Sequence, residues 1–390
     1  VQWWRYTRNP ASRLPGPMQA LLLFWPFFLT RGIHTDADIP VFTKTFFSPS
    51  FSLLPGQILK HPINLTFPEG EIAITAFTAD LVFDDGSESG NPVPLTQTYL
   101  HHWTVQQEVN HNAGFCDYEA RYGGYLKLSY LFGVGSESRN TPIKFDSPYG
   151  LVVNDSDQWW VDLHAIDLRD TVDPLGCREC LCAETGVVPR SKGYIGGLTC
   201  CKDGTRCRTK SSAAADDAPG KAVSYRLRYN ISWREDIKSV APVSIFVMDV
   251  TGDWSHKDKH ACMIEYDVPR ANVTGIEVYV RNASFYFPYD GRVVHAVAHL
   301  HSGATHAIVR RASTGEIVCR SDAVYGNGTE AGNEKGYVVG ITQCPQGWEG
   351  KKGEEFHMRV FYDTTGGLTT RPDASHVGVM GYVWMATIAN

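Results

Sequence analysis

The sequence lacks an apolar run long enough to cross a bilayer. The run at residues 20–29 has ten residues, whereas a membrane-spanning helix needs about 20. A short apolar run behind Arg5, Arg8 and Arg13 is typical of a secretory signal. We therefore expect residues 1–34 to be a signal or leader region, the protein to be exported, and no membrane anchor to follow.

Basic charge is not in excess. The 390-residue chain has a net charge of −6 and a pI of about 6.2, so no cationic surface for nucleic acid or anionic lipid is indicated. The sequence also lacks a Gly-x-Ser-x-Gly nucleophile motif and a phosphate-binding glycine loop. These absences argue against a nucleic-acid partner, a serine hydrolase of that type and a nucleotide-binding enzyme.

No long amphipathic helix stands out either. Apolar and polar residues instead alternate with period two, as in residues 125–132, 160–166 and 275–281. Residues 293–301, 357–362 and 381–388 are expected to be further strands. Aromatic residues make up 12% of the chain and suit half-buried strands. The sequence therefore predicts an all-β protein with two tandem antiparallel β-sandwich domains of a jelly-roll-like kind.

The chain has ten cysteines, an even number, and six of them lie between residues 177 and 207. In an exported protein they are expected to form disulfides, whereas in the cytosol the same spacing would suggest zinc. The pairing does not follow from the sequence. The expected disulfide cysteines are Cys116, Cys177, Cys180, Cys182, Cys200, Cys201, Cys207, Cys262, Cys319 and Cys344.

The cysteine cluster divides the chain. We expect a first sandwich domain at residues 38–172, a disulfide-rich insert and linker at 173–222, and a second sandwich domain at 223–390. Six Asn-x-Ser/Thr sequons agree with export and predict surface glycosylation. They begin at Asn64, Asn154, Asn230, Asn272, Asn282 and Asn327.

Among the fourteen histidines, three groups are suggestive. His299 and His301 form an i, i+2 pair, and such residues on a strand point to the same face. His164 lies within an alternating stretch, and His101 and His102 are adjacent. Adjacent strand residues point to opposite faces, so His101 and His102 can share one ion only if the strand is bulged or ends there.

Met380 adds a possible soft ligand, in a late strand-like stretch. Imidazole suits copper, zinc, iron and nickel, and a thioether prefers Cu(I). A set of two histidines and a methionine therefore favours copper, whereas a set of three histidines fits copper or zinc.

The chain closely resembles the plant stress up-regulated nodulin family of secreted proteins. The motifs Tyr99-Leu-His-His-Trp-Thr104, Cys200-Cys201-Lys-Asp203 and His299-Leu-His-Ser-Gly303 carry this resemblance, which covers nearly the whole mature chain. It implies a stress-related glycoprotein of the apoplast or cell wall. It implies no defined activity.

More remotely, the order His-His, His, His-x-His, Met resembles that of the copper type II, ascorbate-dependent monooxygenases, such as the peptidylglycine α-hydroxylating and dopamine β-monooxygenases. That resemblance implies one copper ion in each of two β-sandwich domains. One ion would store and pass an electron, and the other would activate O2 beside a substrate C–H bond, with ascorbate as the reductant. The implied ligands are His101, His102 and His164 for the first ion, and the catalytic His299, His301 and Met380 for the second.

The sequence departs from the peptide-amidating members where those enzymes hold their substrate. Val297 stands where they have an arginine, and Tyr382 and Trp384 stand where they have an asparagine and a tyrosine. A carboxylate anchor is therefore missing. We expect these three residues to face an aromatic or otherwise apolar, non-peptide substrate, and Asp162 to orient the ring of His164.

Two other function classes fit the same residues. A non-catalytic, monomeric extracellular protein could bind a glycan, a cell-wall component or a protein partner on the same scaffold. A zinc hydrolase could use His101, His102 and His164 with an open position for water. Metal content separates them: two coppers favour the monooxygenase, one zinc favours the hydrolase, and no metal favours the binding protein.

Overall fold

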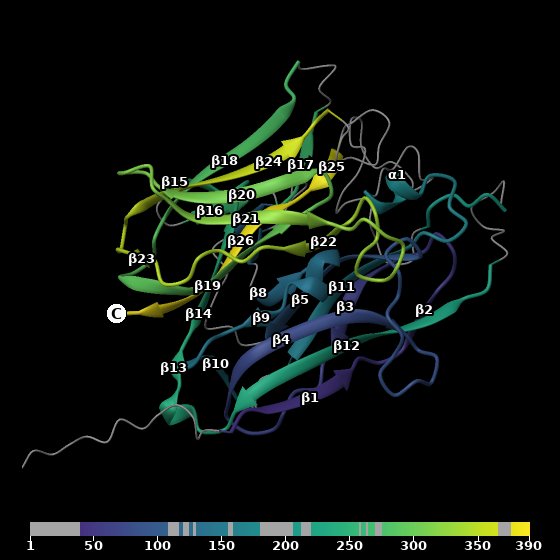
Figure 1. Ribbon diagram of the computed structural model, residues 1–390, viewed down its shortest axis with the longest axis horizontal. Helices are drawn as coiled ribbons and strands as arrows, with labels where there is room; N and C mark the ends of the chain where they lie inside the picture. The colour runs from purple at the N-terminus through teal and green to yellow at the C-terminus, as the bar shows by residue number, and fades with distance from the viewer. Residues whose placement is uncertain are drawn as a thin grey trace, which may run out of the picture. The chain divides into compact units, whose positions relative to one another are not determined.

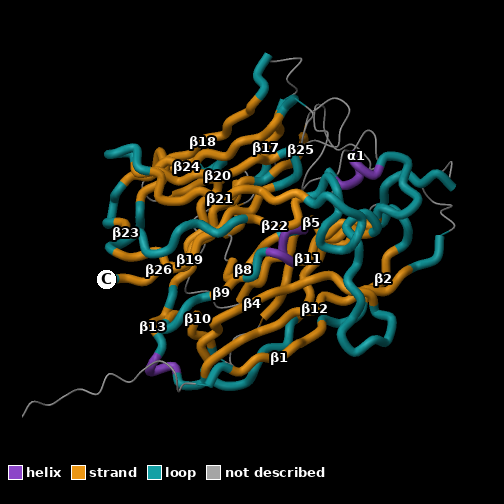
Figure 2. Tube along the Cα trace, viewed as in Figure 1, coloured by secondary structure: helices purple, strands orange, loops and turns teal. Residues whose placement is uncertain are grey.

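In the computed structural model of the protein, the regular secondary structure is almost entirely β-strand, joined by loops (Figure 2). The structure describes residues 40–107, 117–119, 125–127, 130–154, 159–179, 206–211, 220–256, 259–262, 264–269, 275–365 and 376–390. The expected leader at 1–34 lies outside them. The described helices are the short α1 (Pro174–Arg178), η2 (Ser136–Asn140) and η3 (Ile237–Ser239), and no described helix has the length and hydropathy that a bilayer span requires. The predicted all-β class is confirmed.

Two sheets pack over the first core. The seven-stranded sheet has the order β1 (Phe42–Phe47), β12 (Val223–Arg234), β4 (Ile72–Phe83), β10 (Tyr149–Val153) and β13 (Ala241–Pro242), with β2 (Phe51–Leu53) on β12 and β9 (Ile143–Lys144) on β4. The four-stranded sheet has the order β3 (Ile58–Asn64), β11 (Trp159–Asp167), β5 (Thr98–Gln107) and β8 (Tyr130–Val134). Phe77 of β4 meets Trp103 of β5 with ring centroids 5.4 Å apart, so the two sheets face each other.

Two further sheets enclose a second core. One has the order β14 (Ser244–Asp249), β26 (Gly381–Ala389), β19 (Gly291–Leu300) and β23 (Glu349–Gly350). The other has the order β18 (Val278–Tyr286), β24 (Glu355–Asp363), β20 (Ala304–Arg311), β21 (Ile317–Tyr325) and β22 (Val338–Ile341). Phe246 and Phe285 join them, with ring centroids 5.9 Å apart. Alternate residues of β24 are buried, as the period-two pattern predicts.

Smaller pairings complete the described sheets. They are β15 (Asp253–His256), β16 (Lys259–Cys262), β6 (Asp117–Glu119) and β7 (Tyr125–Lys127) in one sheet, and β17 (Tyr266–Val268) with β25 (His376–Val379) in another.

Strand β12 does not follow the expected division of the chain at residue 222. It lies between β1 and β4 (Figure 1), pairing Leu227 with Leu81 of β4 and Lys44 of β1 with Ile231. The chain therefore returns from the insert into the first group of sheets before it enters the second. Residues from Ile39 to Asn390 form one compact unit.

The segment around η2 connects the two groups of sheets. Ser136 Oγ donates to the carbonyl oxygen of Val338 at 2.8 Å, and Asn140 Nδ2 donates to that of Val339 at 2.8 Å. The backbone N–H of Ile341 donates in turn to Thr141 Oγ1 at 2.8 Å. These bonds hold a loop of the first half against β22 of the second, and they fix the residue between them, Glu137.

Two of the expected disulfides lie within the described residues. Cys177 of α1 is bonded to Cys207, and Cys319 of β21 to Cys344. The expected disulfide cysteines Cys116, Cys180, Cys182, Cys200 and Cys201 lie outside those residues, and of Cys262 only the backbone is described. The Cys177–Cys207 bond anchors α1, whose first turn is capped where Asp173 Oδ1 accepts from the Gly176 N–H at 2.9 Å.

Candidate metal centre

A β-bulge brings the adjacent histidines to one site. Between β5 and β11, His164 pairs with His102 and Ala165 pairs with Leu100, so His101 is an extra residue without a partner in the register. A bulge of this kind turns the side chain of the extra residue. The bulge that adjacent histidines need to share one ion is therefore present. The His101 ring stacks on His164 with centroids 4.3 Å apart, and the His102 ring lies 5.0 Å from that of His164.

The three imidazoles have the spacing of a metal site. Their ligand atoms all lie within 4.8 Å of one another, and the Nδ1 atoms of His101 and His102 are 3.2 Å apart. Two nitrogen ligands at about 2.0–2.1 Å from a tetrahedral ion are separated by about 3.3 Å. Both ring nitrogens of His164 are buried without a hydrogen-bond partner in the described structure. This donor set fits a transition metal that prefers nitrogen, with copper and zinc both suited.

The surroundings keep these rings neutral. Burial holds the pKa values of His101, His102 and His164 well below the usual value, and the positive charge of Lys60 acts in the same direction. Lys60 lies opposite His164 in the register of β3 and β11, and burial lowers its own pKa. A neutral imidazole is the form that binds a metal, so no proton has to be displaced near neutral pH.

Asp162 does not orient His164 as expected, since neither ring nitrogen of His164 has a partner within the described residues. Burial raises the pKa of Asp162, against the lowering effect of the positive charges of Lys60 and His61. The orienting carboxylates occur instead at histidines of the second half.

Glu137 is the first of these carboxylates. Its Oε1 lies 2.7 Å from Nδ1 of His299, and Nε2 of His299 is buried with no partner among the residues that the structure describes. A carboxylate on one ring nitrogen fixes the tautomer and turns the other nitrogen to a metal. The backbone of Gly135 packs against the same ring, where an added Cβ would lie 2.9 Å from Cε1 of His299.

His301 and Met380 lie side by side at the ends of β19 and β26. The Tyr362 hydroxyl accepts from the His301 N–H at 3.3 Å and donates to the Met380 carbonyl oxygen at 2.9 Å. Leu300 pairs with Gly381, so these two residues are the next positions in the register. The ring of His301 also lies 4.7 Å from that of His101, centroid to centroid. The two histidine sets, which lie far apart in the sequence, therefore meet at one place.

A further buried histidine, His376 of β25, was not predicted as a site residue. Its Nδ1 lies 3.2 Å from Oε1 of Glu179, and its Nε2 is buried without a described partner. The sequence offered one indication, the position of His376 four residues before Met380. Among the described residues, the set of His101, His102 and His164 is the one whose ligand atoms lie within 4.8 Å, so a site at the other histidines would have to close around its ion.

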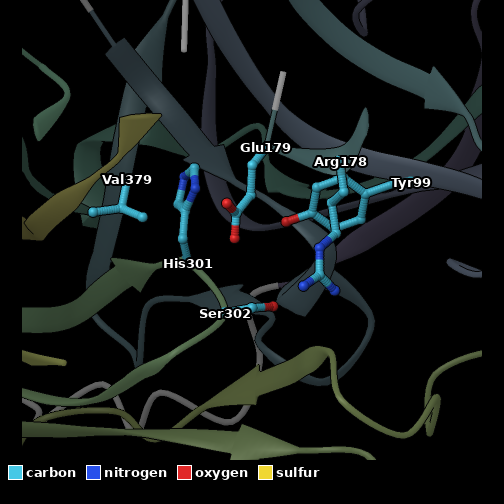
Figure 3. A pocket seen from close by; sticks show the side chains of 6 residues that line it. All are labelled: Tyr99, Arg178, Glu179, His301, Ser302 and Val379. Atoms are coloured by element: carbon cyan, nitrogen blue, oxygen red, sulfur yellow. The ribbon is translucent and has the colours of Figure 1, made fainter. Parts of the chain in front are cut away.

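A pocket opens beside His301 (Figure 3). It is lined by Tyr99, Arg178, Glu179, His301, Ser302 and Val379. The buried guanidinium of Arg178 lies over the ring of Tyr337 at 4.6 Å and over that of Tyr99 at 5.6 Å. Arg178, which the sequence did not single out, thus brings a guanidinium from α1 to this pocket. A guanidinium between aromatic rings is suited to planar anionic groups.

The three residues expected to face a substrate occupy different positions. Tyr382 stacks on His299 with ring centroids 6.0 Å apart, so it belongs to the metal centre. Trp384 is buried and packs at 6.0 Å from Phe132 and 6.1 Å from His295, and Val297 is buried opposite it.

Comparison with solved structures gives only weak likenesses. The Penaeus vannamei nodavirus particle has 9% identity, with 100% of this chain and 99% of that chain covered and a TM-score of 0.19. The mavirus major capsid protein has 11% identity, 97% and 93% coverage and a TM-score of 0.21. The infectious bursal disease virus VP2 subviral particle has 8% identity, 90% and 72% coverage and a TM-score of 0.21. At these TM-scores and identities, the likenesses indicate neither a shared fold nor a shared function.

No curated protein sequence matches the chain. The pattern of one protein family does, over residues 40–390, which include every histidine of the candidate metal centre. The description of that family names a response to stress and neither an activity nor a cofactor. The chain belongs to the stress up-regulated Nod 19 family.

Proposed function

We propose that this protein is a secreted copper-dependent monooxygenase that hydroxylates a C–H bond of a small, non-peptide substrate with O2 and ascorbate. The observation that carries the proposal is the cluster of His101, His102 and His164, three buried, neutral imidazoles with ligand atoms within 4.8 Å of one another. Buried polar atoms normally have partners. A bound metal ion would supply the partner that the His164 nitrogens lack.

The second set of ligands, His299, His301 and Met380, favours copper as the metal. Met380 lies next to His301, and a thioether beside imidazoles favours copper over zinc. Bound copper would supply one-electron redox chemistry and the activation of O2. The contact between the rings of His101 and His301 would give an electron a short path between the two sets.

The residues around the sites have separate tasks in this proposal. Glu137 holds His299 in one tautomer. The pocket beside His301 is small and would have to widen to admit a substrate, whose aromatic ring or anionic group Tyr99 and Arg178 would then position. In the overall reaction, one atom of O2 enters the C–H bond as a hydroxyl group and the other leaves as water. Ascorbate is oxidised to dehydroascorbate and supplies the two electrons, with protons from it and from the solvent.

Metal analysis of protein secreted from a eukaryotic host tests the proposal. We expect two copper ions per chain, and O2 uptake that depends on ascorbate. One zinc ion and no copper would favour a hydrolase at the three-histidine site. Absence of any tightly bound metal, before and after incubation with copper, would contradict the proposal and favour an extracellular binding protein.

A further inference from the structure

The most conspicuous group that the proposed reaction does not use is His376. It is fully buried, with 0% of its surface exposed. Its Nε2 atom has no hydrogen-bond partner in the described part of the chain, although its Nδ1 is paired with Glu179. This is the same arrangement as at His299, where Glu137 binds Nδ1 and Nε2 is left buried without a partner. In both histidines, a carboxylate pairs with Nδ1 and leaves Nε2 available to bind a metal ion.

The free nitrogen of His376 lies against the turn that follows the His-x-His motif. Gly303, two residues after His301, has a φ of 96°, and a Cβ at this position would overlap the Nε2 atom of His376. Only glycine combines that backbone conformation with that approach. The ring of His376 also lies 5.9 Å from the ring of Tyr362, whose hydroxyl joins His301 to Met380. His376 therefore lies against two residues, Gly303 and Tyr362, that adjoin His301 and Met380.

Glu179 reaches this position from the cysteine-rich part of the chain. It follows α1 directly, and its N–H donates to the Leu175 carbonyl oxygen at 3.3 Å. The helix is fixed by the Cys177–Cys207 disulfide and by the Asp173 cap. Figure 3 shows the carboxylate of Glu179 pointing into the pocket beside the ring of His301.

We propose that His376 is a ligand of the second metal ion, beside His301 and Met380, and that Glu179 is the residue that turns its Nε2 to the metal. The proposal rests on the metal centre of the proposed function and extends it. It makes the second site richer in nitrogen than a set of two histidines and a methionine. It also assigns a function to the disulfide-rich segment, since α1 positions the Glu179 carboxylate that orients a ligand.

Copper titration with electron paramagnetic resonance of the secreted protein tests this assignment. The wild-type protein is compared with His376→Ala, Glu179→Gln and the matched control His295→Ala. His295 is a suitable control because it is equally buried, lies on β19 and packs against Phe145 and Trp384 instead of the site. Circular dichroism reports whether each variant keeps its fold.

We expect wild type and His295→Ala to bind two coppers. His376→Ala should bind the second ion at least ten-fold more weakly, with one nitrogen coupling fewer in its spectrum, and millimolar imidazole should restore that coupling. Glu179→Gln should weaken the second ion about 10- to 100-fold. If His376→Ala folds and the affinity and spectrum of its second ion are unchanged, the assignment of His376 is wrong, while the proposed function stands. If His376→Ala does not fold, the same result in Glu179→Gln has the same meaning. A wild-type protein without copper would overturn the proposed function together with it.

Discussion

At the scale of single residues, the candidate metal centre combines clustered histidines with ring nitrogens that the fold buries without satisfying. The His164 nitrogens and the Nε2 atoms of His299, His301 and His376 all lack hydrogen-bond partners among the described residues. An unsatisfied buried polar group costs about 1–3 kcal/mol. Several in one place are a large fraction of a typical stability of about 5–15 kcal/mol. A bound ion would remove that cost at several nitrogens at once.

The contribution of Met380 can be separated from its packing. Replacing it in Met380→Ile removes the thioether and keeps an apolar side chain, so we expect ascorbate-dependent O2 uptake to fall at least 100-fold while the fold persists. Met385→Ile is the matched control, because Met385 is buried on the same strand, β26, in the second core. A volume-conserving apolar change costs less than about 1.5 kcal/mol. Equal activities of the two variants would show that Met380 is not a metal ligand.

Asp249 gives a prediction about pH. Burial raises its pKa to about 7, while the N–H and hydroxyl of Thr251 donate to its Oδ1. Between the unfolded pKa near 4 and the folded pKa, the native state binds the extra proton, so its stability falls as the pH rises. The slope is at most about 1.4 kcal/mol per pH unit.

Asp249→Asn keeps an acceptor for Thr251 and cannot titrate. In urea unfolding of the metal-free proteins, we expect the free energy of unfolding of the wild type, relative to Asp249→Asn, to decrease from pH 4 to pH 7. Parallel pH profiles for the two proteins would show that Asp249 ionises normally in the fold.

At the scale of elements, local patterns predicted the strands well. The expected strands at 160–166, 293–301 and 357–362 became β11, β19 and β24. In β24 every second residue is buried, since a strand with one buried face imposes period two on the sequence. The bulge at His101 was required by the adjacent histidines, if they shared an ion, and it is present. These features depend on neighbours in the sequence, which is why one sequence reveals them.

The carboxylates could not be predicted in the same way. Glu137 lies 162 residues from His299, and Glu179 lies 197 residues from His376. Each pair is set by tertiary packing, through η2 against β22 and through the disulfide that anchors α1. Asp162 was chosen because it lies near His164 in the sequence, and proximity in the sequence was the wrong criterion. Arg178 was missed for the same reason.

Helix α1 should link the Cys177–Cys207 bond to the second metal site. Replacing both cysteines with alanine should lower the free energy of unfolding by about 2–4 kcal/mol. It should also weaken the second copper selectively, because Glu179 would lose its anchor, while the three-histidine site keeps its affinity. Copper titration of the double variant in comparison with the wild type measures both effects. Equal weakening of both sites would mean that the disulfide supports the fold and not the position of Glu179.

At the scale of the whole molecule, we expect glycans at the exposed sequon asparagines and not at the half-buried one. The sequon residues Asn64, Asn154, Asn282 and Asn327 are exposed, and Asn272 lies outside the described residues. Asn230 is half-buried within β12, where its Oδ1 accepts from Thr45 Oγ1 at 2.7 Å and its Nδ2 donates to Thr78 Oγ1 at 3.2 Å.

A glycan at Asn230 would have to replace a hydrogen of the Nδ2 atom that contacts Thr78, at a half-buried position between β1 and β4. Glycopeptide mapping of the secreted protein should therefore find sugar at the four exposed asparagines and none at Asn230. Full occupancy of Asn230 would contradict this arrangement of β1, β12 and β4.

The two groups of sheets should be stabilised together by copper. His101 and His301 come from different groups and their rings touch, and the η2 segment joins the same two groups by hydrogen bonds. Residues from Ile39 to Asn390 form one compact unit. An ion that binds only the folded chain stabilises it by about 2.7 kcal/mol at a concentration 100 times its Kd. Because the ligands belong to both groups, that free energy should act on a single unfolding transition.

Calorimetry with copper and with a chelator checks this coupling. We expect one transition in both conditions, at a higher temperature with copper. In His164→Ala the shift should be smaller, because one site loses a ligand, but the transition should remain single. If copper instead separates the melting curve into two peaks and moves one of them, the groups of sheets unfold independently, and the contact between His101 and His301 does not couple them.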